Sequence, residues 1–327
     1  MNNEFLQKVL DDNRELSSLP QTLAEVIRAA RDDDTSAEQM ARVMKKDLAL
    51  TARVLRMVNS PFYGRSRQIS SMTEAVVTIG MRQITALALS SSVYMLTSDW
   101  TSELDRVRFW RHSLEVAIAS QMIAEKTGYR NTEEVFAGGL LHDIGLLILE
   151  KSFPQQFGEV WNRAEREGRL TDLETSFWGT NHAHVGQFLL EQWQLPEIIC
   201  KAVGHHHTFF EPETRDPELK PYQIVNLAHL VSKFTISSEQ PVNTSLLVNK
   251  EILRNNLDIP SSDLLDVEKN LFSRTMTEAS YLEIDVGSID DVLLEANRML
   301  FEQYVNVENL LKEVRDLKQQ VAHYQAN

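Results

Sequence analysis

Histidines gather in one part of the sequence, and a histidine–aspartate pair stands among them. The stretch GLLHDIGLLILEK, residues 139–151, places His142 beside Asp143 in an otherwise apolar run. Neutral imidazole and carboxylate groups suit Zn, Fe, Mn or Ni when several of them converge from distant segments. Eight of the nine histidines lie between residues 104 and 235: His112, His142, His182, His184, His205, His206, His207 and His229. The clustering makes a metal site one candidate.

A structural role is the alternative for the same residues. A His-Asp pair can be a hydrogen-bonded strut inside a helix bundle, and the run of three histidines from His205 can be a solvated loop. His112 stands among large apolar residues, so a core histidine bonded to a carbonyl explains it as well as a ligand does. His205 taken alone fits a loop, and His184 fits a surface position or a partner of a ligand. The residues support the two interpretations about equally.

The elements that must position these residues are helices. Apolar residues recur at helical spacing, and 12 Gly and 9 Pro are too few for a turn-rich sheet protein, so we expect an all-α fold. Thr35 and Glu38 offer a capping box for one helix, and Pro61 ends the next helix because it lacks an amide hydrogen. Further helices are expected over about residues 71–79, 82–96, 243–256 and 262–281.

Length and composition restrict the class of protein. A chain of 327 residues favours two lobes, and a net charge of -14 repels the phosphates of nucleic acid and of anionic lipid. The only cysteine, Cys200, cannot form an intramolecular disulfide, which is typical of the reducing cytoplasm. The amino terminus does not have the pattern of a secretory signal, and the longest uncharged run, residues 83–98, is short for a membrane span. We expect a cytoplasmic protein without nucleic-acid or membrane partners.

Three regions are expected along the chain. Residues 1–100 would form an amino-terminal lobe of about five helices, with a boundary at Asp99–Ser102, and residues 101–240 would form the histidine-rich helical lobe. Residues 241–327 would hold further helices and a terminal heptad segment. No internal repeat, Gly-rich phosphate loop or nucleophile elbow is present in the sequence.

The carboxyl-terminal heptad has apolar residues at its a and d positions. They are Leu293, Ala296, Leu300, Val307, Leu310, Val314, Leu317, Val321 and Tyr324, with Gln303 as the one polar break. This spacing predicts a coiled-coil seam, and an identical chain is the nearest partner, so a parallel homodimer is expected. The alternative is an amphipathic helix that packs on its own domain.

The order of the histidine motifs resembles a known family. FWRHS, GLLHDIG, NHAHVGQFLL and the HHH run are similar to the HD superfamily of metal-dependent phosphohydrolases and its HD-GYP branch. LPQTLAEVI, RVLRMVNSPFYG and MTEAVVTIGMRQITALAL extend the resemblance to the HDOD family, the HD-related output domain of bacterial signalling proteins. The resemblance covers about residues 15–235 and implies two helical lobes, the second an HD-like bundle.

Carried over position by position, the resemblance implies a set of metal ligands with two departures. A histidine, His229, stands where the superfamily has its later aspartate, and Leu146 stands where the hydrolases have a lysine that would be expected to hold a substrate phosphate. No GYP sequence follows the histidine run. The ligands implied, for Fe, Mn or Zn, are His112, His142, Asp143, His182, His206, His207 and His229.

These departures favour a regulatory protein over an enzyme. We expect a non-catalytic signal-transduction protein, with no catalytic residue assigned, that binds a ligand or partner such as a nucleotide or a signalling protein. A metal-dependent phosphohydrolase acting on a nucleotide or cyclic dinucleotide is the alternative, because the metal ligands are kept. An inert scaffold whose only activity is dimerisation is the third possibility.

Overall fold

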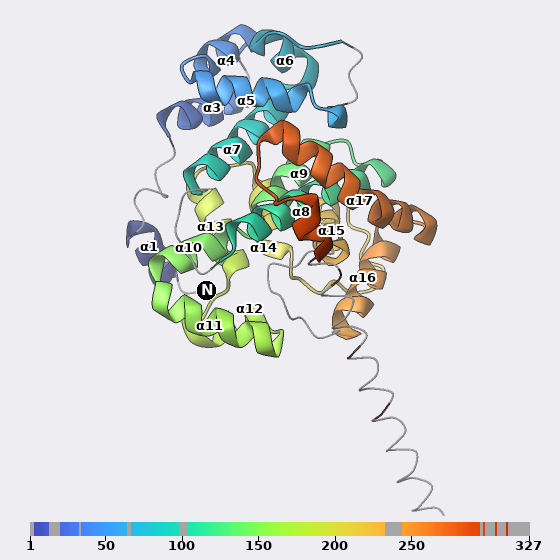
Figure 1. Ribbon diagram of the computed structural model, residues 1–327. Coiled ribbons are helices and arrows are strands. Elements are labelled where there is room, and N and C mark those ends of the chain that lie inside the picture. Colours follow the sequence, from blue (N-terminus) through green and yellow to red (C-terminus); the bar gives the residue numbers. More distant parts are fainter. Residues whose placement is uncertain are drawn as a thin grey trace, which may run out of the picture. The chain divides into compact units, whose positions relative to one another are not determined.

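The fold is all-α, as expected. The computed structural model describes residues 3–12, 20–32, 34–63, 67–97, 104–232 and 244–294 with the single positions 297, 305 and 312, and these residues form helices without any strand (Figure 1). The chain divides into two compact units, residues 1–286 and 287–327. The expected boundary at Asp99–Ser102 and nearly all of the heptad segment lie outside the described residues. The three regions and the coiled coil therefore remain predictions.

Residues 20–97 hold five α-helices and one short 3₁₀ helix in the part of the chain that the structure describes. They are α3 (Gln21–Arg31), α4 (Ala37–Met44), α5 (Leu48–Val58), η1 (Pro61–Tyr63), α6 (Met72–Ile79) and α7 (Met81–Thr97). The capping box of α4 lies one residue later than expected: the hydroxyl of Ser36 accepts from the amide of Gln39, and the Gln39 side chain accepts from the amide of Ser36. Both positions satisfy the same sequence rule, so the sequence alone did not separate them.

The Ser-rich run near residue 90 belongs to a buried helix. Within α7, the hydroxyl of Ser90 donates to the carbonyl of Ala86 at 2.8 Å, and that of Thr97 donates to Val93 at 2.9 Å, so these hydroxyls are satisfied inside the core. Among the described helices none is by itself long and apolar enough to cross a membrane; α6 and α7 pass that test only as a pair bent by 118°.

The histidine-rich region is a bundle around one central helix, α8 (Arg106–Lys126). Every residue of α8 from Phe109 to Ala124 is buried, and the helix packs against α9 (Thr132–Leu141), α15 (Lys220–Val231) and α17 (Ser261–Leu282). Helices α10 (Ile144–Ser152), α13 (His182–Gln192) and α14 (Glu197–His205) complete the bundle. A helix that is buried all round forms the core of its domain, so the residues of α8 are held in fixed positions.

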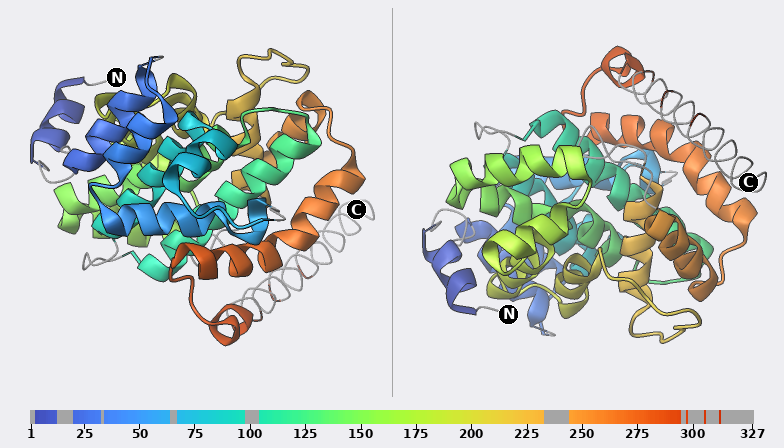
Figure 2. Two further views of the ribbon diagram at one scale, coloured as in Figure 1. Left: turned by 90° about the horizontal axis from the view of Figure 1, so that it is seen from above. Right: turned by 90° about the horizontal axis from the view of Figure 1, so that it is seen from below.

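Other helices lie on the outside of this bundle. Helix α11 (Pro154–Glu167) packs on α10 and on α12 (Leu170–Trp178), and α16 (Thr244–Asn256) packs on α15 (Figures 1 and 2). Helix α1 (Asn3–Asp12) contacts α10 and α13, and its Phe5 ring stacks on Phe153 with centroids 5.6 Å apart. The expected helices at 71–79, 82–96, 243–256 and 262–281 are confirmed as α6, α7, α16 and α17, with ends that differ by one residue.

Glycine permits the close approach of α10 to α13. A Cβ atom at Gly145 would lie 1.9 Å from the carbonyl oxygen of His182 and 2.9 Å from the amide nitrogen of Gly186, both of which are backbone atoms that cannot rotate away. The start of α10 therefore touches the start of α13, and this contact brings Asp143 close to His182.

We expect Gly145→Ala to lower the free energy of unfolding by about 3 kcal/mol, because the added methyl group forces the two helices apart. Gly138→Ala is the matched control, since its Cβ would meet only side-chain atoms, of Ala202 at 3.1 Å and of Val225 at 3.5 Å. The control should stay within about 1 kcal/mol of the wild type, helped by the higher helix propensity of alanine. Equal urea-denaturation midpoints for the two variants would contradict this account of the α10–α13 contact.

Candidate metal centre

Six helices bring the seven predicted ligands together. His112 lies within α8, and His142 and Asp143 form the turn between α9 and α10. His182 is the first residue of α13, and His206 and His207 follow α14 directly. His229 lies in the last turn of α15. Six of these polar side chains reach the centre from the turn or from helix ends, and His112 reaches it from within α8.

The Asp143 carboxylate stands between two groups of imidazoles. Its Oδ1 atom lies 3.3 Å from Nε2 of His182 and 3.4 Å from Nε2 of His206. Its Oδ2 atom lies 3.0 Å from Nε2 of His142 and 3.6 Å from Nε2 of His112. One carboxylate therefore offers one oxygen to each group, which is the arrangement of a ligand shared by two cations.

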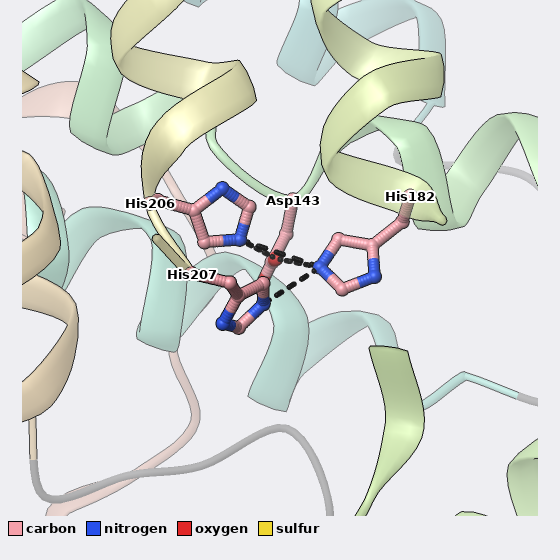
Figure 3. A group of neighbouring side chains, drawn as sticks. All are labelled: Asp143, His182, His206 and His207. Atoms are coloured by element: carbon pink, nitrogen blue, oxygen red, sulfur yellow. Dashed lines mark hydrogen bonds and ion pairs between the residues drawn. The ribbon is translucent and has the colours of Figure 1, made fainter. Parts of the chain in front are cut away.

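The first group consists of Asp143, His182, His206 and His207 (Figure 3). Each residue presents one ligand atom, and these atoms all lie within 4.8 Å of one another. The Nε2 atom of His182 is 3.0 Å from Nε2 of His207 and 3.3 Å from Nε2 of His206. Three imidazoles and one carboxylate oxygen thus face a common point.

The second group consists of His112, His142 and His229, whose ligand atoms also lie within 4.8 Å of one another. The Nε2 atoms of His112 and His142 are 3.1 Å apart. The ring of His229 lies with its centroid 5.3 Å from that of His112 and 5.2 Å from that of His142. Its Nδ1 atom is buried and has no hydrogen-bond partner within the described part of the chain. With Oδ2 of Asp143, this group also offers three imidazoles and one carboxylate oxygen.

Hydrogen bonds to the outer ring nitrogens orient four of the histidines. The Nδ1 atoms of His142 and His206 each donate at 2.6 Å to the carbonyls of Gly139 and Val203. The Nδ1 atom of His182 lies 2.7 Å from a carboxylate oxygen of Glu174. Acceptors of this kind hold a proton on Nδ1, so that Nε2 of each ring, when the ring is neutral, carries a lone pair directed at the centre.

His112 is oriented through a relay of two side chains. Its Nδ1 atom lies 3.0 Å from the hydroxyl of Ser232, and that hydroxyl donates its only hydrogen to the carboxylate of Glu115. Ser232 must therefore accept from Nδ1 of His112, which leaves Nε2 of His112 without a proton in the neutral ring.

The inner nitrogens of the neutral rings cannot satisfy one another. Nε2 of His112 and Nε2 of His142 both carry lone pairs in the neutral rings, and these two atoms lie 3.1 Å apart. Facing lone pairs in a buried site repel unless a proton or a cation lies between them. Imidazole nitrogen and carboxylate oxygen are the donors that Zn²⁺, Fe²⁺ and Mn²⁺ accept, so the residues fit a divalent cation in each group.

Burial and charge set the protonation of these side chains. Burial lowers the pKa of His206 to about 4 and holds the pKa values of His207 and His229 well below the usual value, so these rings are neutral at pH 7. For His182, burial opposes the charged form, but the carboxylates of Glu174 and Asp143 outweigh it and raise the pKa to about 10. Burial also acts to raise the pKa of Asp143, yet His142, His182 and His206 keep it well below its usual value.

The remaining histidines described by the structure lie outside both groups. His184 is half-buried two positions past His182 on α13, where its backbone amide donates to the side chain of the cap residue Asn181. His205 is the last residue of α14 and not a loop residue as expected, and its ring stacks on Tyr222 with centroids 5.5 Å apart. Glu174 was not foreseen, because it lies on a separate helix, α12, and reaches His182 only in the folded chain.

A sequence model of the HDOD domain matches residues 16–209, which is more than half of the chain. The chain belongs to the HDOD family. An HDOD domain protein with unknown function from Geobacter sulfurreducens is 26% identical, with a TM-score of 0.64 over 85% of this chain and 98% of that one. A protein from Shewanella amazonensis SB2B with the provisional name of a phosphohydrolase is 22% identical, with a TM-score of 0.64 over 86% of this chain and 98% of that one.

Among curated proteins, an uncharacterized protein of Treponema pallidum (strain Nichols) is 24% identical over 255 residues, which cover 72% of this chain. The matched region spans 49% of that protein, so this chain corresponds to about half the length of its curated relative. The family and the fold follow from these comparisons. The activity does not, and it has to be argued from the site.

We expect His142→Ala to reduce the metal content of the purified protein and to lower its melting temperature, because a lost ligand removes binding free energy that is coupled to folding. His184→Ala is the matched control, since it removes a nearby imidazole that belongs to neither group. Elemental analysis and thermal unfolding measure both effects. Metal-free wild-type protein whose melting curve does not move on addition of Mn²⁺, Fe²⁺ or Zn²⁺ would contradict the prediction.

Metal affinity should rise with pH. In the metal-free protein His182 holds a proton up to about pH 10, and a cation must displace that proton in order to bind Nε2. We therefore expect the apparent affinity for Zn²⁺ to increase by about tenfold per pH unit between pH 7 and pH 9, with one proton released per chain from this residue. Titration calorimetry in buffers of different ionisation enthalpy counts the protons. A pH-independent affinity would show that the cation does not displace the proton of His182.

Proposed function

We propose that this HDOD protein is a metal-dependent signalling module that does not hydrolyse phosphodiesters. The observation that carries the proposal is the donor set of the two histidine groups. Oδ1 of Asp143 with His182, His206 and His207 makes four protein donors, and Oδ2 of Asp143 with the three residues of the second group makes four more. Zn²⁺ held by four protein ligands is typical of structural sites, whereas a catalytic site keeps a position open for water.

Histidine at position 229, where the superfamily has an aspartate, contributes to the complete protein coordination of the second group. An aspartate in its place would bring a second negative charge and two oxygens to the second group. The imidazole of His229 instead brings one neutral donor, and its ring lies 5.4 Å from that of His206 and 4.8 Å from that of His207. The ring therefore stands between the two groups and takes up space that a bridging hydroxide would need.

The position expected to hold a substrate phosphate also lacks the means to do so. Leu146 is 1% exposed and lies in the hydrophobic core, where it offers neither a charge nor a hydrogen-bond donor. His142 and His206 are fully buried, and Asp143 is 3% exposed. A phosphodiester would have to displace packed helices before it touched these residues.

In this proposal the residues of the centre hold helices together. A bound divalent cation would supply positive charge that neutralises Asp143 and links imidazoles from α8, α13, α14 and α15. Glu174 and the Ser232–Glu115 pair would keep His182 and His112 in the ligating tautomer. Loss of a cation would leave facing lone pairs and one buried carboxylate, which would loosen the packing around α8. Metal occupancy would thus be the signal or the condition for signalling.

A metal-dependent phosphohydrolase is the second candidate, and one observation favours it. The shared carboxylate of Asp143 between two groups of imidazoles is also the plan of two-metal hydrolytic sites. The provisional name of the Shewanella amazonensis protein agrees with it, although at 22% identity this likeness supports the fold alone.

The homodimer through residues 293–324 belongs to the signalling proposal. It would be the route by which a signal leaves the domain.

We expect negligible turnover of a cyclic dinucleotide by protein loaded with Mn²⁺ or Zn²⁺, because Leu146 cannot hold a phosphate and four protein donors would complete the coordination of Zn²⁺. Product formation followed by chromatography is the measurement. His142→Ala, prepared in the same way, is the control for contaminating phosphodiesterases, since it lacks one predicted ligand. A wild-type rate of about 1 per second or more, abolished in the variant, would establish the hydrolase instead.

A further inference from the structure

A cavity of about 780 Å³ lies in the first unit away from the metal ligands. Its walls come from α5, from the segment 67–70 and from Tyr281 near the end of α17. None of the seven metal ligands lines it. Pockets that take small molecules commonly have volumes of roughly 300–1,000 Å³, so the size suits a ligand of that class.

One wall of this cavity is fixed by hydrogen bonds. The side-chain amide of Asn59, just after α5, donates to the carbonyl of Leu55 at 2.7 Å and to that of Ile69 at 2.8 Å. The Asn59 side-chain oxygen accepts from the amide of Ile69 at 2.8 Å. Ile69 is 4% exposed and anchors the segment in the core. The neighbouring side chains of Arg67 and Ser70 are therefore presented from a fixed backbone.

Two arginines face this cavity in a chain whose net charge is -14. Arg56 pairs with Glu283 at 2.7 Å, and Glu283 also lies 3.6 Å from Arg53, so one carboxylate is shared by two guanidinium groups. Arg67 is exposed and has no acidic partner among the residues that the structure describes. Within the described part of the chain Arg67 therefore has no carboxylate partner, and Arg56 shares one with Arg53. The two guanidinium groups at the cavity favour an anion with several oxygens.

The opposite wall offers a surface for a flat apolar group. Tyr281 is 39% exposed, and its side chain lines the same cavity as Leu55 and Ala52. An exposed aromatic ring close to arginines is suited to stack a planar ring while the guanidinium groups bind its charged substituent.

We propose that this cavity binds a nucleotide, with its phosphate at Arg67 and Arg56 and its base against Tyr281. The proposal goes beyond the metal centre and does not depend on it. A ligand held in this way would bridge α5 and α17, which are in contact. Helix α17 also packs on α8, the helix that carries His112, and it is the last helix before the second unit begins at residue 287. Nucleotide binding would therefore act on the helix that leads to the heptad segment.

Equilibrium binding of AMP and GMP to the full chain tests this proposal. The titrations use the full chain as purified, with unbound cations removed by gel filtration, and inorganic phosphate is titrated separately. We expect saturable binding of at least one nucleotide at one site. Arg67→Glu and Tyr281→Ala should each weaken it by about tenfold or more, and Tyr281→Phe should retain it because the ring is kept.

Two controls place the site. Arg42→Glu makes the same charge change at an exposed arginine on α4, outside the cavity, and should leave the affinity unchanged. His184→Ala removes an imidazole near the metal centre that belongs to neither group of ligands, and it should also bind the nucleotide normally. The proposal is overturned if neither nucleotide saturates the protein at millimolar concentration, if inorganic phosphate binds as tightly as the nucleotides, or if Arg67→Glu and Arg42→Glu have equal effects.

Discussion

A single buried carboxylate, that of Asp143, is the group on which the arrangement of the histidine-rich bundle depends. It is 3% exposed, and imidazole nitrogens approach both of its oxygens at 3.0–3.6 Å. A buried charge is strongly unfavourable unless it is paired. The backbone amides inside the surrounding helices cannot pair with it, because they are used in helical hydrogen bonds. The residues that surround it come from α8, α13, α14 and α15, so the same interaction that neutralises the carboxylate also fixes how four helices meet.

The position of Asp143 depends in turn on local features of the chain. The turn between α9 and α10 exposes the carboxylate to the centre, and Gly139 and Gly145 on either side let α9 approach α8 and α10 approach α13. A Cβ at Gly139 would lie 2.8 Å from the Cα of Ala117 on α8. The glycines of the HDIG stretch therefore serve close packing, while its two polar residues serve the centre.

Sequence patterns located many of the helices, and the family resemblance named seven candidate ligands that the fold brings together. Helical spacing of apolar residues located α6, α7, α16 and α17 to within one residue, because a buried stripe must repeat every three to four positions. The division of the ligands into two groups could not be foreseen, since it depends on which oxygen of Asp143 faces which helix. The Ser232–Glu115 relay was hidden for the same reason, as it joins residues 117 apart. The capping box of α4 was misplaced by one residue because both positions satisfy the same local rule.

The proposed metal centre and the proposed nucleotide cavity would give this HDOD protein two places at which a small ligand acts on α8 and α17. The central claim is that both cations have complete protein coordination, and anomalous diffraction from crystals grown with Zn²⁺ tests it most directly. The account predicts two peaks, one on each side of Asp143, each about 2.0–2.2 Å from three imidazole nitrogens and one carboxylate oxygen. A single peak, or a cation with a water ligand in place of His229 or His207, would contradict it.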